Sequence, residues 1–260
     1  MKKSITIGII LIFTAIETGY SANGPEANKI VDIREKIAWF LGEDTAATQE
    51  VSNQFIDYIA LFQSNKKDPE KQAYLIRKIF FKSQRLFLRT YENYVTLGEL
   101  FGPKGKFDCV TGTALYALML DALDIDYSIK ETDFHVYLLV HLEDRDILLE
   151  STDPVDGFII DGEEIMFRKK LYRLSPENGS IDESNIDGLK YLMCIDRKIT
   201  LKQLAGLQYF NLAAKSFNSG DMENALHHLD YASMLYNSNR INDLKEIITL
   251  QVSDEISMRE

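Results

Sequence analysis

Two side chains in this sequence could together carry out nucleophilic catalysis: the thiol of Cys109 and the imidazole of His135. Cys109 follows a helix-breaking segment, residues 102–105 (GPKG), and Asp108 directly before it is a good helix N-cap. We therefore expect Cys109 to open a helix, where backbone N–H groups and the helix dipole favour an anion. A thiolate placed there is a good nucleophile if a base lies within hydrogen-bonding distance.

His135 is the best candidate for that base among the four histidines. It begins a predicted strand, directly after a charged stretch, and should lie near the mouth of the predicted sheet. His141 has the same strand parity but lies farther along the strand. His227 and His228 belong to a later helical segment, and we expect both at the surface.

A catalytic imidazole also needs an acid that fixes its tautomer. Residues 135–142 and 147–152 predict two strands joined by a polar turn. If the turn centres on Asp144, His135 lies opposite Asp153, which we favour as the acid. A shift of half a residue would turn Asp153 to the other face and bring Glu150 and Thr152 to the side of His135, so Glu150 is the alternative.

The elements that must position these side chains follow from the spacing of apolar residues. Helices are expected at about 30–41, 48–64 and 68–87 and again from Cys109, after a flexible segment at 23–29. Strands are expected at 125–131, 135–142 and 147–152, with further strands or edges at 157–161, 164–174 and 190–196. Helices followed by an antiparallel sheet indicate an α+β fold with helices packed on the sheet. Gly112, inside the predicted helix, suggests close packing beside it.

The chain is predicted to be helical again from Thr200 to its end. One segment has the spacing of a tetratricopeptide repeat, with a turn at Gly220-Asp221; its matching positions are Tyr209, Leu212, Ala213, Ala225, Leu229 and Ala232. A single repeat cannot bury its own face, so it must pack on the main domain, on the last helix or on a protein partner. The expected regions are therefore N-terminal helices (23–70), a central domain (71–199) and a C-terminal helical region (200–260).

The first 22 residues have the features of a signal peptide, which predicts a secreted or periplasmic protein. Two lysines precede an apolar run that is too short to span a bilayer, and small residues follow it. A net charge of −11 argues against nucleic acid as a partner. No metal-ligand cluster or phosphate loop is evident, so no cofactor is expected. An exported chain could also pair Cys109 with Cys194 in a disulfide, which would abolish thiol chemistry.

The run GKFDCVTGTALYALMLDALDIDY, followed by HVYLLV and LLESTDP, resembles the core of the transglutaminase-like superfamily. The resemblance covers roughly residues 75–160 and implies a Cys at the start of a helix, with His and Asp on adjacent strands. It gives Cys109 the position of the nucleophile and His135 that of the base. The acid position falls on Asp153 or, if EST matches the motif, on Glu150.

The resemblance implies an exported cysteine hydrolase or acyl-transferase that acts on amide bonds of peptides or proteins. Hydrolysis is the default, since water is always present. A second hypothesis is a catalytically silent protein-binding scaffold of the cell envelope, built from the same fold and the helical tail. A third, recognition of peptide crosslinks in the envelope, rests only on the signal peptide and the amide chemistry.

Overall fold

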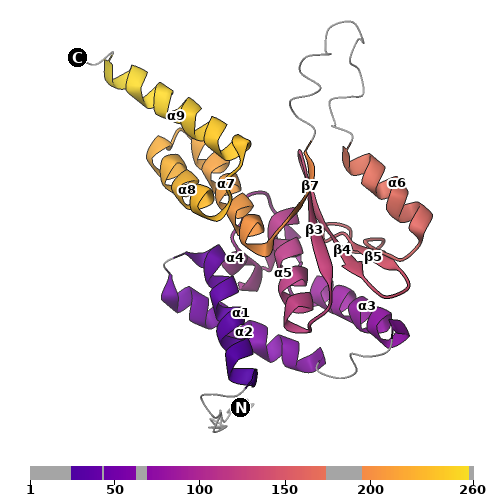
Figure 1. Ribbon diagram of the computed structural model, residues 1–260. Helices are drawn as coiled ribbons and strands as arrows, with labels where there is room; N and C mark the ends of the chain where they lie inside the picture. Colours follow the sequence, from indigo (N-terminus) through magenta and orange to yellow (C-terminus); the bar gives the residue numbers. More distant parts are fainter. Residues whose placement is uncertain (1–24, 43, 63–68, 174–194, 258–260) are drawn as a thin grey trace, which may run out of the picture.

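The computed structural model describes residues 25–42, 44–62, 69–173 and 195–257 (Figure 1). Its helices are α1 (Pro25–Leu41), α2 (Thr45–Ile59), α3 (Pro69–Leu86), α4 (Leu97–Phe101), α5 (Cys109–Ala122), α6 (Gly162–Arg173), α7 (Leu201–Asn218), α8 (Met222–Leu235) and α9 (Asn239–Ser257), with a 3₁₀ turn at Ala60–Phe62. Its strands are β1 (Thr90–Tyr91), β2 (Lys106–Phe107), β3 (Tyr127–Thr132), β4 (Val136–His141), β5 (Asp146–Leu149), β6 (Phe158–Ile159) and β7 (Asp196–Ile199). The expected signal peptide and Cys194 lie outside the described residues.

The α+β class expected from the sequence is confirmed. Five strands form an antiparallel sheet in the order β6-β5-β4-β3-β7, and β1 and β2 form a separate parallel pair. Alternation along β4 sends its side chains to opposite faces of the sheet. Val136, Leu138 and Val140 join the main core on the side of α5, whereas Tyr137 and Leu139 pack on the side of α6. Figure 1 shows the sheet between these two helices.

Helix α5 is the centre of the core. Its residues from Val110 to Leu120 are all buried, so the helix is enclosed on every side rather than on one stripe. The sheet covers it on one side, and α1, α3, α4 and α7 pack around the rest. Cys109 therefore lies at the N-terminal end of a helix that the core encloses on every side.

The C-terminal helices pack on this core rather than standing apart. Helix α7 contacts α5, α1 and α8, and one core cluster includes residues of all three regions expected from the sequence. The buried side chain of Gln208 on α7 donates to the carbonyl of Phe40 (2.7 Å) and accepts from the N–H of Leu97 (2.8 Å). Helix α8 also contacts α9. The repeat-like pair, α7 and α8, therefore packs both on the main domain and on the last helix.

Two expectations about secondary structure were wrong. Residues 25–29, expected to be flexible, form the first turns of α1, which Pro25 can open because the first helical residue needs no N–H donor. The segment 164–174, expected as a strand, lies largely in α6 instead. The carboxylate of Asp161 accepts the N–H of Glu164 (2.9 Å), and Ile165 and Tyr172 recur at helical spacing on its inner face.

Candidate functional site

Cys109 is the first residue of α5, as expected. Asp108 is the N-cap: its Oδ1 accepts the N–H of Thr111 (2.8 Å), and the Thr111 hydroxyl accepts the N–H of Asp108 (2.9 Å). This reciprocal capping fixes where the helix begins and therefore where the thiol points. Cys109 is a free, half-buried cysteine.

His135, just before β4, lies against a buried carboxylate. Its Nε2 is 2.5 Å from Oε2 of Glu150, which is only 2% exposed. The other oxygen of Glu150 accepts the N–H (3.0 Å) and the hydroxyl (2.6 Å) of Thr152. Both carboxylate oxygens are thus engaged, and the carboxylate has a fixed orientation toward the imidazole.

The thiol of Cys109 lies beside the same imidazole and is one of the groups that raise its pKa. Burial lowers the pKa of His135, but the interactions with Cys109 and Glu150 outweigh it and raise the pKa to about 10. Burial has the opposite effect on Glu150 and raises its pKa, but the hydrogen bonds with His135 and Thr152 outweigh burial and hold that pKa below the usual value. The pair is therefore an imidazolium and a carboxylate at neutral pH. Because Glu150 engages Nε2, Nδ1 is the ring nitrogen left for the thiol.

Asp153, the acid favoured from the sequence, does not reach His135. Its Oδ1 accepts the N–H of Asp156 (2.9 Å), and its Oδ2 pairs with Arg168 on α6 (3.2 Å). The reason is strand register. His141 pairs with Asp146, so the turn centres half a residue before Asp144, and Glu150 takes the place beside the histidine.

Sequence reasoning missed an aromatic side chain beside His135. The ring of Tyr172, on α6, lies 4.9 Å from the ring of His135 and 4.9 Å from that of Tyr137. Burial, followed by the nearby Glu150 carboxylate, raises the pKa of the Tyr172 phenol. Tyr172 thus shields the imidazolium–carboxylate pair from the α6 side. Only the apolar spacing of α6, read as a helix, could have indicated it.

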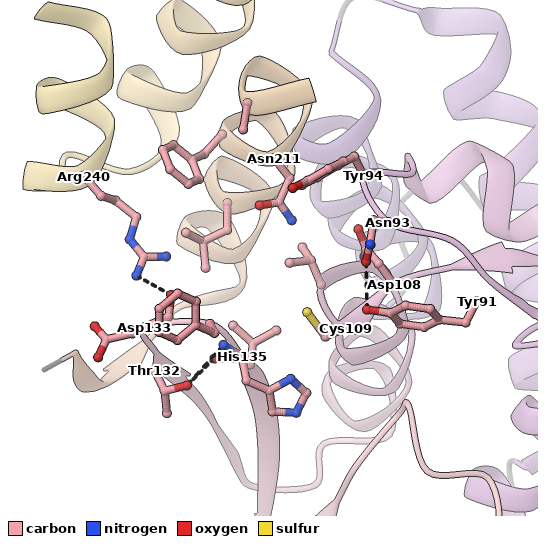
Figure 2. Close-up of a pocket in the computed structure, with 16 residues that line it drawn as sticks. Tyr91, Asn93, Tyr94, Asp108, Cys109, Thr132, Asp133, His135, Asn211 and Arg240 are labelled. Atoms are coloured by element: carbon pink, nitrogen blue, oxygen red, sulfur yellow. Dashed lines mark hydrogen bonds between the residues drawn. The ribbon is translucent and has the colours of Figure 1, made fainter. Parts of the chain in front are cut away.

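A cavity of about 450 Å³ opens beside the thiol (Figure 2). It is enclosed by the start of α5, the β3–β4 connection and α7. Its lining residues are Tyr91, Asn93, Tyr94, Asp108, Cys109, Val110, Thr132, Asp133, Phe134, His135, Val136, Leu207, Phe210, Asn211, Ala214 and Arg240. The thiol and the imidazole therefore face one space large enough for a ligand.

Two tyrosines form another part of the cavity lining, Tyr91 at the end of β1 and Tyr94 between β1 and α4, and neither was singled out from the sequence. The hydroxyl of Tyr91 donates to Asn93 Oδ1 (3.0 Å). Tyr91 is 54% exposed; partial burial, followed by the nearby Cys109, raises the pKa of its phenol to about 12, so the phenol stays protonated at neutral pH. Tyr94 has a positive φ of 62°, an unfavourable conformation for a side chain of this size. Such strain is typical of binding sites, where the surrounding structure holds it in place.

The other histidines lie away from this cavity. His141 bonds through Nδ1 to Asp146 (2.8 Å) and through Nε2 to the hydroxyl of Ser128 (2.9 Å), on the α6 face of the sheet. His227 and His228 lie on α8, where their rings contact Tyr231 and Tyr209.

Within the described ranges, no group of three or more metal-ligating side chains occurs. None of the described helices is long and apolar enough to cross a membrane.

Comparison with protein-family models, with curated proteins and with solved structures finds no match to this chain. The likeness to the transglutaminase-like superfamily therefore remains an expectation from the sequence motifs. The geometry of the site has to be interpreted from its own chemistry.

Proposed function

We propose that this protein is a transglutaminase-like cysteine hydrolase or acyl-transferase that acts on amide bonds of peptides or proteins. The observation that supports the proposal is the position of His135, which lines the same cavity as the thiol of Cys109 and bonds to the buried Glu150 carboxylate. A nucleophile, a base and an orienting acid in hydrogen-bonded series are the arrangement that covalent acyl transfer requires. Glu150 replaces Asp153 in the proposed triad.

In the proposed reaction the thiolate of Cys109 attacks the carbonyl carbon of the amide. A C–S bond forms, and the π electrons of the carbonyl move to its oxygen, which the backbone N–H groups at the start of α5 stabilise. When the C–N bond breaks, the imidazolium of His135 gives its proton to the leaving amine and a thioester remains. Water then attacks the thioester while neutral His135 takes one of its protons, and breaking of the C–S bond releases a carboxylic acid and regenerates the Cys109 thiolate beside the imidazolium; an amine in place of water gives transfer.

The first test is alkylation of Cys109 by iodoacetamide as a function of pH. A thiolate paired with an imidazolium should react rapidly at pH 6.5, where ordinary thiols, which ionise at about pH 8.5, react slowly. His135→Ala should slow the reaction at pH 6.5 by about tenfold or more. The assay pH lies about two units below the pKa of an ordinary thiol, so without the imidazolium only a small fraction of the cysteine would be ionised. Asp153→Asn is the matched control and should leave the rate within about twofold, because Asp153 contacts Arg168 and not His135.

The second test is hydrolysis of a mixed library of peptide amides, followed by the release of primary amine. Cys109→Ala should abolish it, and a variant that kept full activity would refute the proposal. Slow alkylation that His135→Ala does not change would instead favour the scaffold hypothesis, in which Cys109 is a structural residue.

A further inference from the structure

One wall of the cavity beside Cys109 is apolar and comes from the C-terminal region. Leu207, Phe210 and Ala214 line the cavity at helical spacing, so they lie on one face of α7. Figure 2 shows this helix across the cavity from the start of α5. The repeat-like segment therefore contributes directly to the space next to the thiol.

Two of the charged residues that line the cavity, Arg240 and Asp133, are engaged with the protein itself. The guanidinium of Arg240 donates to the carbonyl of Asp133 (3.1 Å), lies 3.5 Å from the buried Glu131 carboxylate and lies 5.7 Å from the ring of Phe210. The carboxylate of Asp133 accepts the N–H of Ile195 (2.9 Å). Because these two charges have partners, neither Arg240 nor Asp133 is free to bind an ionic group of a ligand.

The remaining polar residues of the cavity suit a peptide backbone. Asn93 and Asn211 lie on two sides of the cavity, and each primary amide can both donate and accept a hydrogen bond. The neutral backbone of a bound peptide, held by these two amides, would extend past the thiol of Cys109, and a side chain of that peptide would point toward α7. A ligand pocket of this kind is mostly apolar with a few polar groups that fix orientation.

We propose that Leu207, Phe210 and Ala214 form a subsite for an apolar side chain next to the amide that Cys109 attacks. This inference rests on the proposed function and specifies its substrate class: peptides with an aromatic or large aliphatic residue at that position. Burial of such a side chain favours its binding by roughly tenfold to a hundredfold over a substrate that lacks it.

The test compares two alkylating probes, iodoacetamide and N-benzyl iodoacetamide, by the ratio of their second-order rate constants for Cys109 in the full chain. The wild-type protein should prefer the benzyl probe by about tenfold or more. Ala214→Trp, which fills the subsite, should bring the ratio close to that of a free thiol. Lys215→Trp is the matched control, since Lys215 is the next residue of α7 and is exposed; it should keep the preference.

Phe210→Ala gives a second readout, because it removes apolar surface and requires no extra space. It should lower the benzyl preference, measured as the ratio of the two rate constants, severalfold. A wild-type ratio equal to that of a free thiol, or one that neither variant changes, would overturn the subsite. If alkylation by iodoacetamide is fast and depends on His135 while the ratio shows no preference, only the subsite fails. If alkylation is slow and independent of His135 but the preference holds, the subsite stands and the catalytic proposal fails.

Discussion

Gly112 of α5 lies directly against Ser151, the residue that follows Glu150. A Cβ added at Gly112 would lie 2.7 Å from both the Cβ and the Oγ of Ser151, closer than real Cβ atoms approach a neighbour. Ser151 is fully buried, and its carbonyl accepts a hydrogen bond from Gln84 (2.8 Å). The absent side chain therefore lets the chain after β5 approach the helix that carries Cys109, and it sets the position of the Glu150 carboxylate.

Replacement of Gly112 by alanine should destabilise the protein despite the higher helix propensity of alanine. The propensity gain is about 1 kcal/mol, whereas overpacking in a tight core costs roughly 1–3 kcal/mol, and Ser151 has little room to move. We expect a lower urea midpoint together with slower alkylation of Cys109 at pH 6.5, because Glu150 moves with Ser151. Gly98→Ala in α4 is the control, since the nearest atom to its added Cβ lies 3.5 Å away, an ordinary contact. If Gly112→Ala were as stable and reactive as the control, the close approach would have no role.

Glu150→Gln should change the ionisation of His135. The carboxylate is one of two groups that raise the pKa of His135 to about 10, while burial acts in the opposite direction. With a neutral amide in its place, the pKa of His135 should fall by more than one unit, as measured by NMR titration of the imidazole Cε1 proton. The same titration of Asp153→Asn should give the wild-type value. A fall in the Asp153 variant and not in the Glu150 variant would reverse the assignment of the acid.

The sequence was sufficient to predict that Cys109 opens a helix and that His135 lies at the start of a strand, but not which carboxylate lies beside His135. Asp108 and Thr111 cap the helix through contacts three residues apart, so the position of Cys109 is encoded locally. The acid depends on the centre of the β4–β5 turn, and both alternatives are compatible with the same alternating pattern. The polar run 143–146 does not specify its own turn geometry. A shift of the turn centre by half a residue places Glu150, and not Asp153, on the side of His135.

Tertiary packing determined what the local pattern could not. The packing of α6 brings Tyr172 to His135, and the packing of α7 makes that helix a wall of the cavity. Both contacts join residues far apart in the chain. The spacing around Tyr209 and Ala213 predicted a helical pair that needs a surface to pack on, yet nothing local specified that this surface adjoins Cys109. The resemblance to transglutaminase-like proteins stays a prediction.

The stability of the protein should decline at alkaline pH through His135. Its pKa is about 10 in the folded protein and about 6.5 when unfolded, so the stabilisation is fully present below pH 6.5 and is lost as the pH rises through 10. Urea midpoints of the wild type and of His135→Gln should therefore converge steadily over this interval, because other titrating groups are common to both proteins. A difference that stays constant from pH 6.5 to 10 would mean that His135 is not an imidazolium in the folded protein.

The attachment of the C-terminal helices should depend on one buried carboxylate. Glu131 on β3 is fully buried and accepts hydrogen bonds from the Tyr236 hydroxyl (2.5 Å) and from Nε of Arg197 (2.8 Å). Tyr236 is the C-cap of α8, so this contact ties the repeat-like pair to the sheet beside the cavity. Tyr236→Phe removes one hydrogen bond to a charged acceptor and should cost about 1.5–3 kcal/mol in urea unfolding. Tyr91→Phe, which removes a hydroxyl from an exposed tyrosine, should cost less than about 1 kcal/mol. Since α7 forms the apolar wall, Tyr236→Phe should also weaken the preference for the benzyl probe; equal losses of stability in the two variants would show that Glu131 does not anchor the helices.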